Sequence, residues 1–180
     1  LAITHIMALG WGTMVILGAS HQLLPALIDG KLSSDTQAYF SFGLAAAGIP
    51  MLDYHGRIGP QYNPIAIAQW GLANYNLFHH SRDGARKQKF LAASDWLCSH
   101  LERNPFGLWV WNHHFDWEYR TTLKAPWYSG LAQGQGLSLR VRAYEETKSQ
   151  IYLDTAKRAF AVFLNSIEKG GVVFTDEHGH

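Results

Sequence analysis

The pattern of apolar and polar positions divides the chain into two parts. The first 50 residues carry only three charged side chains, and the other 130 residues carry 26. Leu1–Ile28 is an apolar run without Asp, Glu, Lys or Arg. As a helix rising 1.5 Å per residue, it is long enough to span a hydrocarbon core of about 30 Å. A second apolar run, rich in Ala and Gly, covers Thr36–Leu52. We therefore interpret residues 1–47 as an apolar helical hairpin, either membrane-inserted or buried in a soluble fold.

Four helices are predicted in residues 48–180, where apolar positions recur at helical spacing. Asn63 and Pro64 have the residue types preferred at the cap and first position of a helix. The pair Asp83-Gly84 leaves room only for a tight turn, so the first two helices should pack antiparallel. The stretch 106–115 alternates in the manner of a strand. The predicted helices cover residues 64–82, 85–102, 126–147 and 150–168.

An internal repeat relates the first pair of helices to the second. Ile67-Ala68-Gln69 matches Leu131-Ala132-Gln133, and Phe90-Leu91 matches Tyr152-Leu153, at separations of 64 and 62 residues. Repeated helical hairpins leave apolar faces that neighbouring copies cover. The sequence therefore predicts a mainly α fold, built as part of an array of helical hairpins that lines a groove.

Charge and cysteine content narrow the classes of partner. The formal net charge is +1, which gives no electrostatic reason to expect nucleic acid as a partner. Cys98 is the single cysteine, so neither an intrachain disulfide nor a thiolate metal cluster is available. Homo-oligomerisation stays open.

Amides and aromatic rings are concentrated where the first and third predicted helices begin. The stretches 61–71 and 127–136 carry them, and Gly130, Gly134 and Gly136 indicate close approach by a helix or a ligand. Aromatic faces and planar amides suit sugars, whose C–H faces stack and whose hydroxyls need donors and acceptors. The alternative is that the amides cap neighbouring backbone in a tightly packed fold. The candidate substrate-binding residues are Tyr62, Asn63, Gln69, Tyr128, Gln133, Gln135 and Arg142.

Several ionisable residues follow the predicted strand. His113 and His114 are adjacent, so on a strand they face opposite sides and are a poor metal site. Asp116 and Glu118 are candidates for paired carboxylates, although a surface aromatic patch around them is an equal alternative. Guanidinium groups match carboxylates in a fork, and Arg142 is the candidate clamp. Arg140, two positions earlier, is expected on a solvated helix face. No metal is assigned.

Two motifs resemble the C-terminal domain of the D-glucuronyl C5-epimerase family. They are Gly59-Pro60-Gln61-Tyr62-Asn63-Pro64-Ile65-Ala66-Ile67-Ala68-Gln69-Trp70-Gly71-Leu72 and Trp127-Tyr128-Ser129-Gly130-Leu131-Ala132-Gln133-Gly134-Gln135-Gly136. The resemblance covers residues 48–180 and implies a partial α/α toroid with short strands. It also implies conversion of D-glucuronyl to L-iduronyl units in heparosan or heparan-type polysaccharide. The reaction removes and returns the C5 proton, so it needs acid/base groups and no redox cofactor.

The resemblance leaves the catalytic residues unassigned. We expect the family's acid/base block to follow residues 176–180, which makes a non-catalytic uronate-polysaccharide-binding remnant the first alternative function. A second alternative is a membrane haem protein, because residues 1–47 resemble a transmembrane segment of haem-copper oxidase subunit I-like proteins through their apolar pattern and His5 and His21. From the same residues we expect a membrane-associated, secretory-pathway or cell-envelope location.

Overall fold

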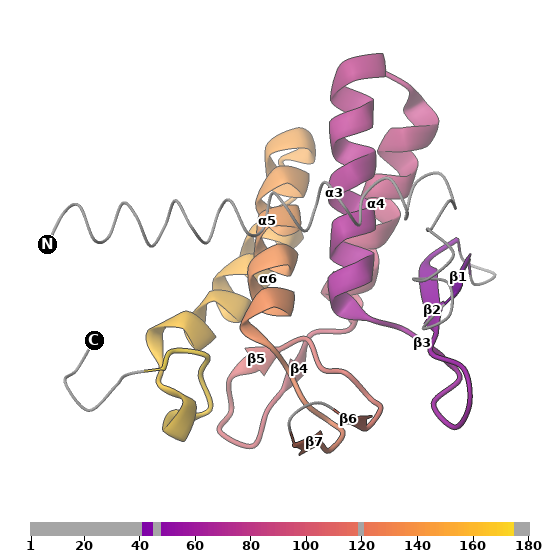
Figure 1. Ribbon diagram of the computed structural model, residues 1–180. Helices are drawn as coiled ribbons and strands as arrows, with labels where there is room; N and C mark the ends of the chain where they lie inside the picture. Colours follow the sequence, from indigo (N-terminus) through magenta and orange to yellow (C-terminus); the bar gives the residue numbers. More distant parts are fainter. Residues whose placement is uncertain (1–40, 45–47, 119–120, 175–180) are drawn as a thin grey trace, which may run out of the picture.

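Two helical hairpins stand side by side in the computed structural model, which describes residues 41–44, 48–118 and 121–174 (Figure 1). The first helix of each hairpin packs against that of the other, and within each hairpin the two helices are antiparallel. The prediction of four helices, paired as two hairpins, is therefore confirmed for the described residues. The helices are α3 (Pro64–Ser81), α4 (Gly84–Ser99), α5 (Gly130–Thr147) and α6 (Gln150–Phe160), with 3-10 turns at Ala161–Leu164 and Ile167–Lys169.

Strands β4 to β7 lie at the end of the hairpins where α3 and α5 begin, the lower end in Figure 1, and the sheet of β1, β2 and β3 stands beside the first hairpin. One sheet has three strands in the order β1-β2-β3, and two further sheets are the pairs β4-β5 and β6-β7. The bounds are β1 Ser41–Leu44, β2 Pro50–Asp53, β3 Pro60–Gln61, β4 Glu102–Arg103, β5 Trp109–Val110, β6 Trp117–Glu118 and β7 Thr122–Leu123.

The helical interpretation of the second apolar run, residues 36–52, is wrong over its described part. Its residues form β1 and the start of β2, paired antiparallel with Phe42 opposite Leu52. Gly48 adopts a left-handed backbone with φ of +72°, and proline at position 50 has no N–H for a helical hydrogen bond, so a helix cannot continue through them. The division of the chain at residue 47 stays a prediction.

The predicted membrane helix Leu1–Ile28 and the two histidines of the haem resemblance lie outside the described residues. Among the helices that the structure does describe, none combines the length and the apolar character needed to cross a lipid bilayer.

The helix ends follow from local hydrogen bonds. The Asn63 side chain accepts from the backbone N–H groups of Ile65 and Ala66, which caps α3 as predicted. Helix α5 begins four residues later than predicted, because the backbone of Trp127 is held extended by hydrogen bonds to His113 at 2.6 and 3.1 Å. Helix α4 ends at Ser99 because the chain then enters β4.

The core lies between the two hairpins, and the indole of Trp111 is packed within it. Trp111 is fully buried, and its Nε1 donates to the Leu97 carbonyl at 2.7 Å. A Cβ atom at Gly136 would lie 2.4 Å from the Trp111 ring, so only glycine lets α5 approach this closely. The close approach predicted from the glycines is thus observed at Gly136, where the Trp111 indole packs directly against the helix backbone. At Gly134 the nearest atom, on Phe163, is 4.0 Å away.

Arg140 is buried, which corrects the expectation of a solvated helix face. Its Nη1 donates to the Ser94 carbonyl and contacts Cys98 Sγ, and its guanidinium lies 5.4 Å from the Tyr152 ring centroid. Burial lowers the pKa of the guanidinium, and the nearby Cys98 partly opposes that shift. Arg140 is buried because α4 and α6 cover that side of α5.

Candidate functional site

A pocket of about 110 Å³ opens at the end of the first hairpin, beside the strands. It lies where α3 begins, α4 ends and the chain leaves β5. The segment just before α3 contributes a phenol and an amide, and the last turn of α4 with its C-cap contributes an indole and an imidazole. The lining residues are Gln61, Tyr62, Trp96, His100, Glu102, Asn112 and His114.

Aromatic rings form one wall of the pocket. Tyr62 and Trp96 have ring centroids 5.4 Å apart with the rings tilted by 42°. Trp96 and His100, one turn apart on α4, stack at 3.8 Å with their rings nearly parallel. The His100 ring is further fixed by its Nδ1, which lies 2.8 Å from the Trp96 carbonyl oxygen. This wall offers flat apolar faces of the kind on which sugar rings stack.

Glu102 organises the polar wall. Its Oε2 accepts from Asn112 Nδ2 at 2.8 Å, and its Oε1 lies 3.0 Å from His114 Nε2. The Glu102 and His114 side chains are 41% and 60% exposed, so both reach solvent from the pocket. A carboxylate, an imidazole and an amide therefore meet at one place, where they can bind hydroxyls and exchange protons.

Of the seven residues predicted from the sequence, Tyr62 lines this pocket. Its neighbour Asn63 is engaged within the fold, because its side-chain oxygen caps α3 and its Nδ2 donates to the Tyr54 hydroxyl at 2.6 Å. Burial raises the pKa of the Tyr54 phenol, and the Asn63 hydrogen bond partly offsets that shift.

The predicted residues at the start of α5 make internal contacts. Gln133 is fully buried, and its amide bonds both backbone groups of Trp111 at 3.1 Å. The Tyr128 hydroxyl donates to the Gly170 carbonyl at 2.8 Å and accepts from Asn104 Nδ2 at 3.1 Å. These contacts match the alternative in which amides and phenols tie neighbouring backbone together.

The remaining predicted residues lie away from the pocket lining. Gln69 and Gln135 are buried, at 5% and 7% exposure. Arg142 is twelve residues into α5, which corresponds to about 18 Å along the helix. Its Nη1 donates to the Ser138 carbonyl and hydroxyl oxygens, and its guanidinium lies 5.7 Å from the Tyr75 ring centroid. The structure therefore does not bring Arg142 together with Tyr62.

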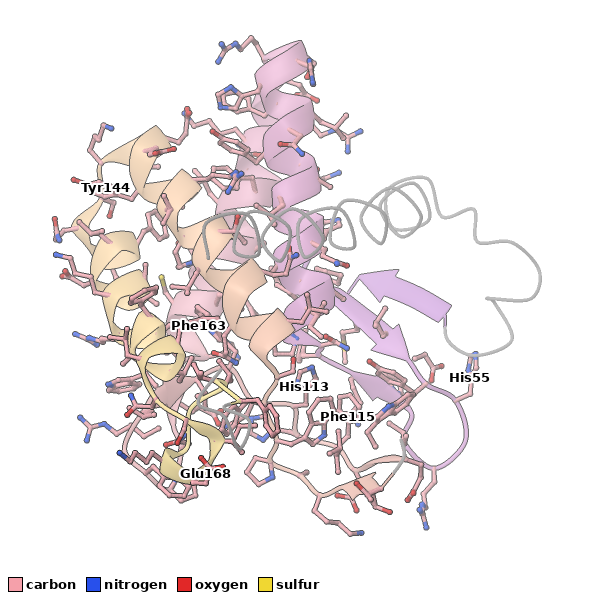
Figure 2. All side chains as sticks on the ribbon, turned by 60° about the vertical axis from the view of Figure 1, so that its left-hand side comes forward. His55, His113, Phe115, Tyr144, Phe163 and Glu168 are labelled. Atoms are coloured by element: carbon pink, nitrogen blue, oxygen red, sulfur yellow. The ribbon has the colours of Figure 1, made fainter. Side chains whose placement is uncertain are left out.

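His113 and His114 face opposite sides of the chain, as predicted. His114 points into the pocket, whereas His113 is fully buried and stacks on Trp127 at 3.9 Å. Figure 2 shows His113 beside Phe115 below the helices, and their ring centroids are 5.8 Å apart. Burial lowers the pKa of His113 to about 4, although its hydrogen bond to the Trp127 carbonyl opposes the shift.

The candidate pairing of Asp116 with Glu118 is not observed in the described contacts. Asp116 accepts from Lys124 Nζ at 2.7 Å and from the Ala125 N–H at 2.9 Å. Glu118 instead accepts from the Thr122 hydroxyl. The Lys124 hydrogen bond holds the pKa of Asp116 below its usual value. In the parts of the chain that the structure describes, no three His, Cys, Asp or Glu side chains gather as a metal site.

Sequence reasoning missed most of the pocket. Trp96 and His100 have the i, i+4 spacing that places two rings on one helix face, so their stacking was predictable. The position of Glu102 was not, because residues 85–102 were predicted as one helix. In the structure Glu102 begins β4 instead, and from this strand its carboxylate reaches Asn112 and His114.

Comparison with known proteins gives a family match for the second half of the chain. Residues 103–178 match the family described as D-glucuronyl C5-epimerase C-terminus. This match to part of the chain agrees with the resemblance seen in the sequence over these residues. The matched segment runs from β4 through both helices of the second hairpin.

A curated relative carries the same name. A stretch of 84 residues is 34% identical to the D-glucuronyl C5-epimerase of Caenorhabditis elegans. That stretch is 46% of this chain and 13% of the relative. The chain therefore spans about an eighth of the length of the curated relative it matches.

Proposed function

We propose that this chain is part of an enzyme that epimerises C5 of D-glucuronyl residues in a heparosan or heparan-type polysaccharide. The observation that carries the proposal is the family match over residues 103–178. The pocket adds chemistry, since Glu102, Asn112 and His114 of its lining lie in or directly before that segment. In this proposal the pocket receives one uronyl unit of the chain.

The pocket has the group types that the reaction needs. Removal of the C5 proton leaves an enolate-like carboxylate, and a proton must then be returned to the opposite face of C5. Glu102 and His114 form a hydrogen-bonded acid/base pair at 3.0 Å on one side. Tyr62 and His100 present a phenol and an imidazole on the aromatic wall. The aromatic rings would hold the sugar face while the polar groups act on C5.

The proposed architecture is a partial α/α toroid. Ile67 is fully buried, whereas its repeat equivalent Leu131 is 46% exposed. An apolar groove of about 540 Å³ also runs along α5 and α6, between Val141 and Phe160. A further helical hairpin packed against α5 would cover both, as the second hairpin covers the first. The proposed location stays membrane-associated, in the secretory pathway or in the cell envelope.

Hydrogen exchange at C5 tests the reaction directly. The full chain is incubated with heparosan in D2O, and deuterium at C5 of glucuronyl units is measured by NMR. Catalysed incorporation, lowered by His114→Gln and by Glu102→Gln, is the expected result. Lys89→Gln on the exposed side of α4 is the control and should exchange like the wild type.

The same experiment distinguishes the proposed enzyme from the first alternative function. Binding of heparosan by a folded chain without any C5 exchange would support a non-catalytic polysaccharide-binding remnant. A folded chain that neither binds heparosan nor catalyses the exchange would refute the proposed substrate.

A further inference from the structure

A second polar-aromatic surface lies outside the pocket, around the indole of Trp109. The Arg103 guanidinium carbon lies 5.0 Å from the Trp109 ring centroid, and that of Arg158 lies 5.6 Å from it. The two cations are therefore within about 11 Å of each other. They come from different elements, β4 and α6, so the fold and not the local sequence brings them together.

Neither guanidinium pairs with an anion in the described part of the chain. Within the described ranges no ion pair or hydrogen bond joins the Arg103 or Arg158 side chain to another residue. Asp154 is one turn before Arg158 on α6, but it accepts instead from Gln150 Nε2 at 2.9 Å. Both arginines are exposed, and Trp109 is partly exposed. Two like charges gathered on one ring without a counter-charge are arranged for an external anion.

The surface is separate from the pocket. Arg103 pairs with Trp109 across the β4-β5 ladder, and Glu102 pairs with Val110. Because neighbouring residues on a strand point to opposite faces, Glu102 faces the pocket while Arg103 faces away from it. A ligand on the arginines therefore does not compete for the groups that line the pocket.

We propose that Arg103, Trp109 and Arg158 form an exosite that binds an anionic unit of a polysaccharide. The guanidinium forks take a carboxylate or a sulfate of the sugar chain, and the indole takes an apolar sugar face. This inference rests on the proposed function for the choice of a polysaccharide over other anions. It adds a second contact along the chain, which strengthens binding of long substrates more than of short ones.

The test compares arginine variants in the full chain. Affinities are measured by calorimetry for a heparosan octasaccharide, which carries only carboxylates, for its N-sulfated form, and for neutral maltooctaose. The double variant Arg103→Ala/Arg158→Ala should bind the anionic sugars about tenfold more weakly and with a smaller dependence on salt. Binding of the neutral sugar should not change.

A matched control is available on the same helix. Lys157 is exposed and adjacent to Arg158, and Lys157→Ala removes the same charge without touching Trp109. Its affinities should stay close to those of the wild type. Arg158→Lys keeps the charge and the fold but loses the planar fork, and it should give part of the loss.

The two sources of the anion give different patterns. Equal losses for both anionic sugars assign the exosite to uronate, and a loss confined to the N-sulfated sugar assigns it to sulfate. A double variant that binds like Lys157→Ala overturns the exosite, and so does a folded wild type that binds neither anionic sugar. Loss of C5 exchange with an intact arginine effect would overturn the proposed reaction alone.

Discussion

The Gln133 amide bridges the backbone of Trp111 on both sides of that residue. Its Oε1 accepts from the Trp111 N–H and its Nε2 donates to the Trp111 carbonyl, each at 3.1 Å and fully buried. The helix that carries one family motif is thereby fixed to the segment after β5, from which Asn112 and His114 reach the pocket. Gln133 therefore supports the pocket through the backbone instead of lining it.

Replacement of this amide should destabilise the fold. Gln133→Ala leaves a buried N–H and a buried carbonyl without partners, at a cost of about 2–4 kcal/mol in the free energy of unfolding. Gln135→Ala is the control, because Gln135 is nearly as buried but its side chain has no hydrogen bond among the described residues, and it should cost less. Urea unfolding measures both. Weakened sugar binding by Gln133→Ala at unchanged stability would instead support the direct sugar contact expected from the sequence.

Substitution of the α5 glycines should separate packing from helix propensity. Gly136→Ala places a methyl group 2.4 Å from the Trp111 ring and should destabilise the protein by about 1–3 kcal/mol. Gly134→Ala meets nothing closer than 4.0 Å and should be neutral or stabilise by up to about 1 kcal/mol. Thermal unfolding of the two variants checks the difference. Similar effects would show that the indole adjusts easily.

Acid should destabilise the protein through His113. The folded-state pKa of about 4 lies below the usual 6.5, so the unfolded chain binds a proton first as the pH falls. The contribution of neutral His113 to the free energy of unfolding is fully present above about pH 6.5. It is lost as the pH falls toward 4, by roughly 3 kcal/mol at 1.36 kcal/mol per pKa unit. In His113→Phe this part of the pH dependence should vanish. Exposed His114, changed to Gln, should leave it intact.

Urea unfolding at pH 7 and pH 4.5 compares these variants with the wild type. The relevant quantity is the difference between wild type and His113→Phe, because carboxylates elsewhere also titrate in this range. An equal loss of stability in both proteins would show that His113 is not the buried group responsible.

The helices were predictable because their signals are local, whereas the pocket depends on contacts between distant segments. Asn63 caps α3 within its own turn, and the Asp83-Gly84 turn fixes the first hairpin. Arg140 was wrongly predicted to face solvent. Helical spacing shows which residues share a face of α5, but it does not show which other helices pack against that face. The run ending at Leu52 has the composition of a helix, and the pairing partner that makes it a strand lies in the same run. Tyr62 was found because it lies within a motif.

The central claim is that the pocket beside Tyr62 and Trp96 holds a uronyl unit. The most direct measurement is the Kd of the full chain for a heparosan octasaccharide, by calorimetry, in wild type and in Tyr62→Ala. Tyr62 is 37% exposed, so its removal should leave the fold intact, and Phe174→Ala, which removes a 72% exposed ring elsewhere, is the control. The account predicts about tenfold weaker binding for Tyr62→Ala and none of this loss for Phe174→Ala. Equal affinities for wild type and a folded Tyr62→Ala protein would contradict it.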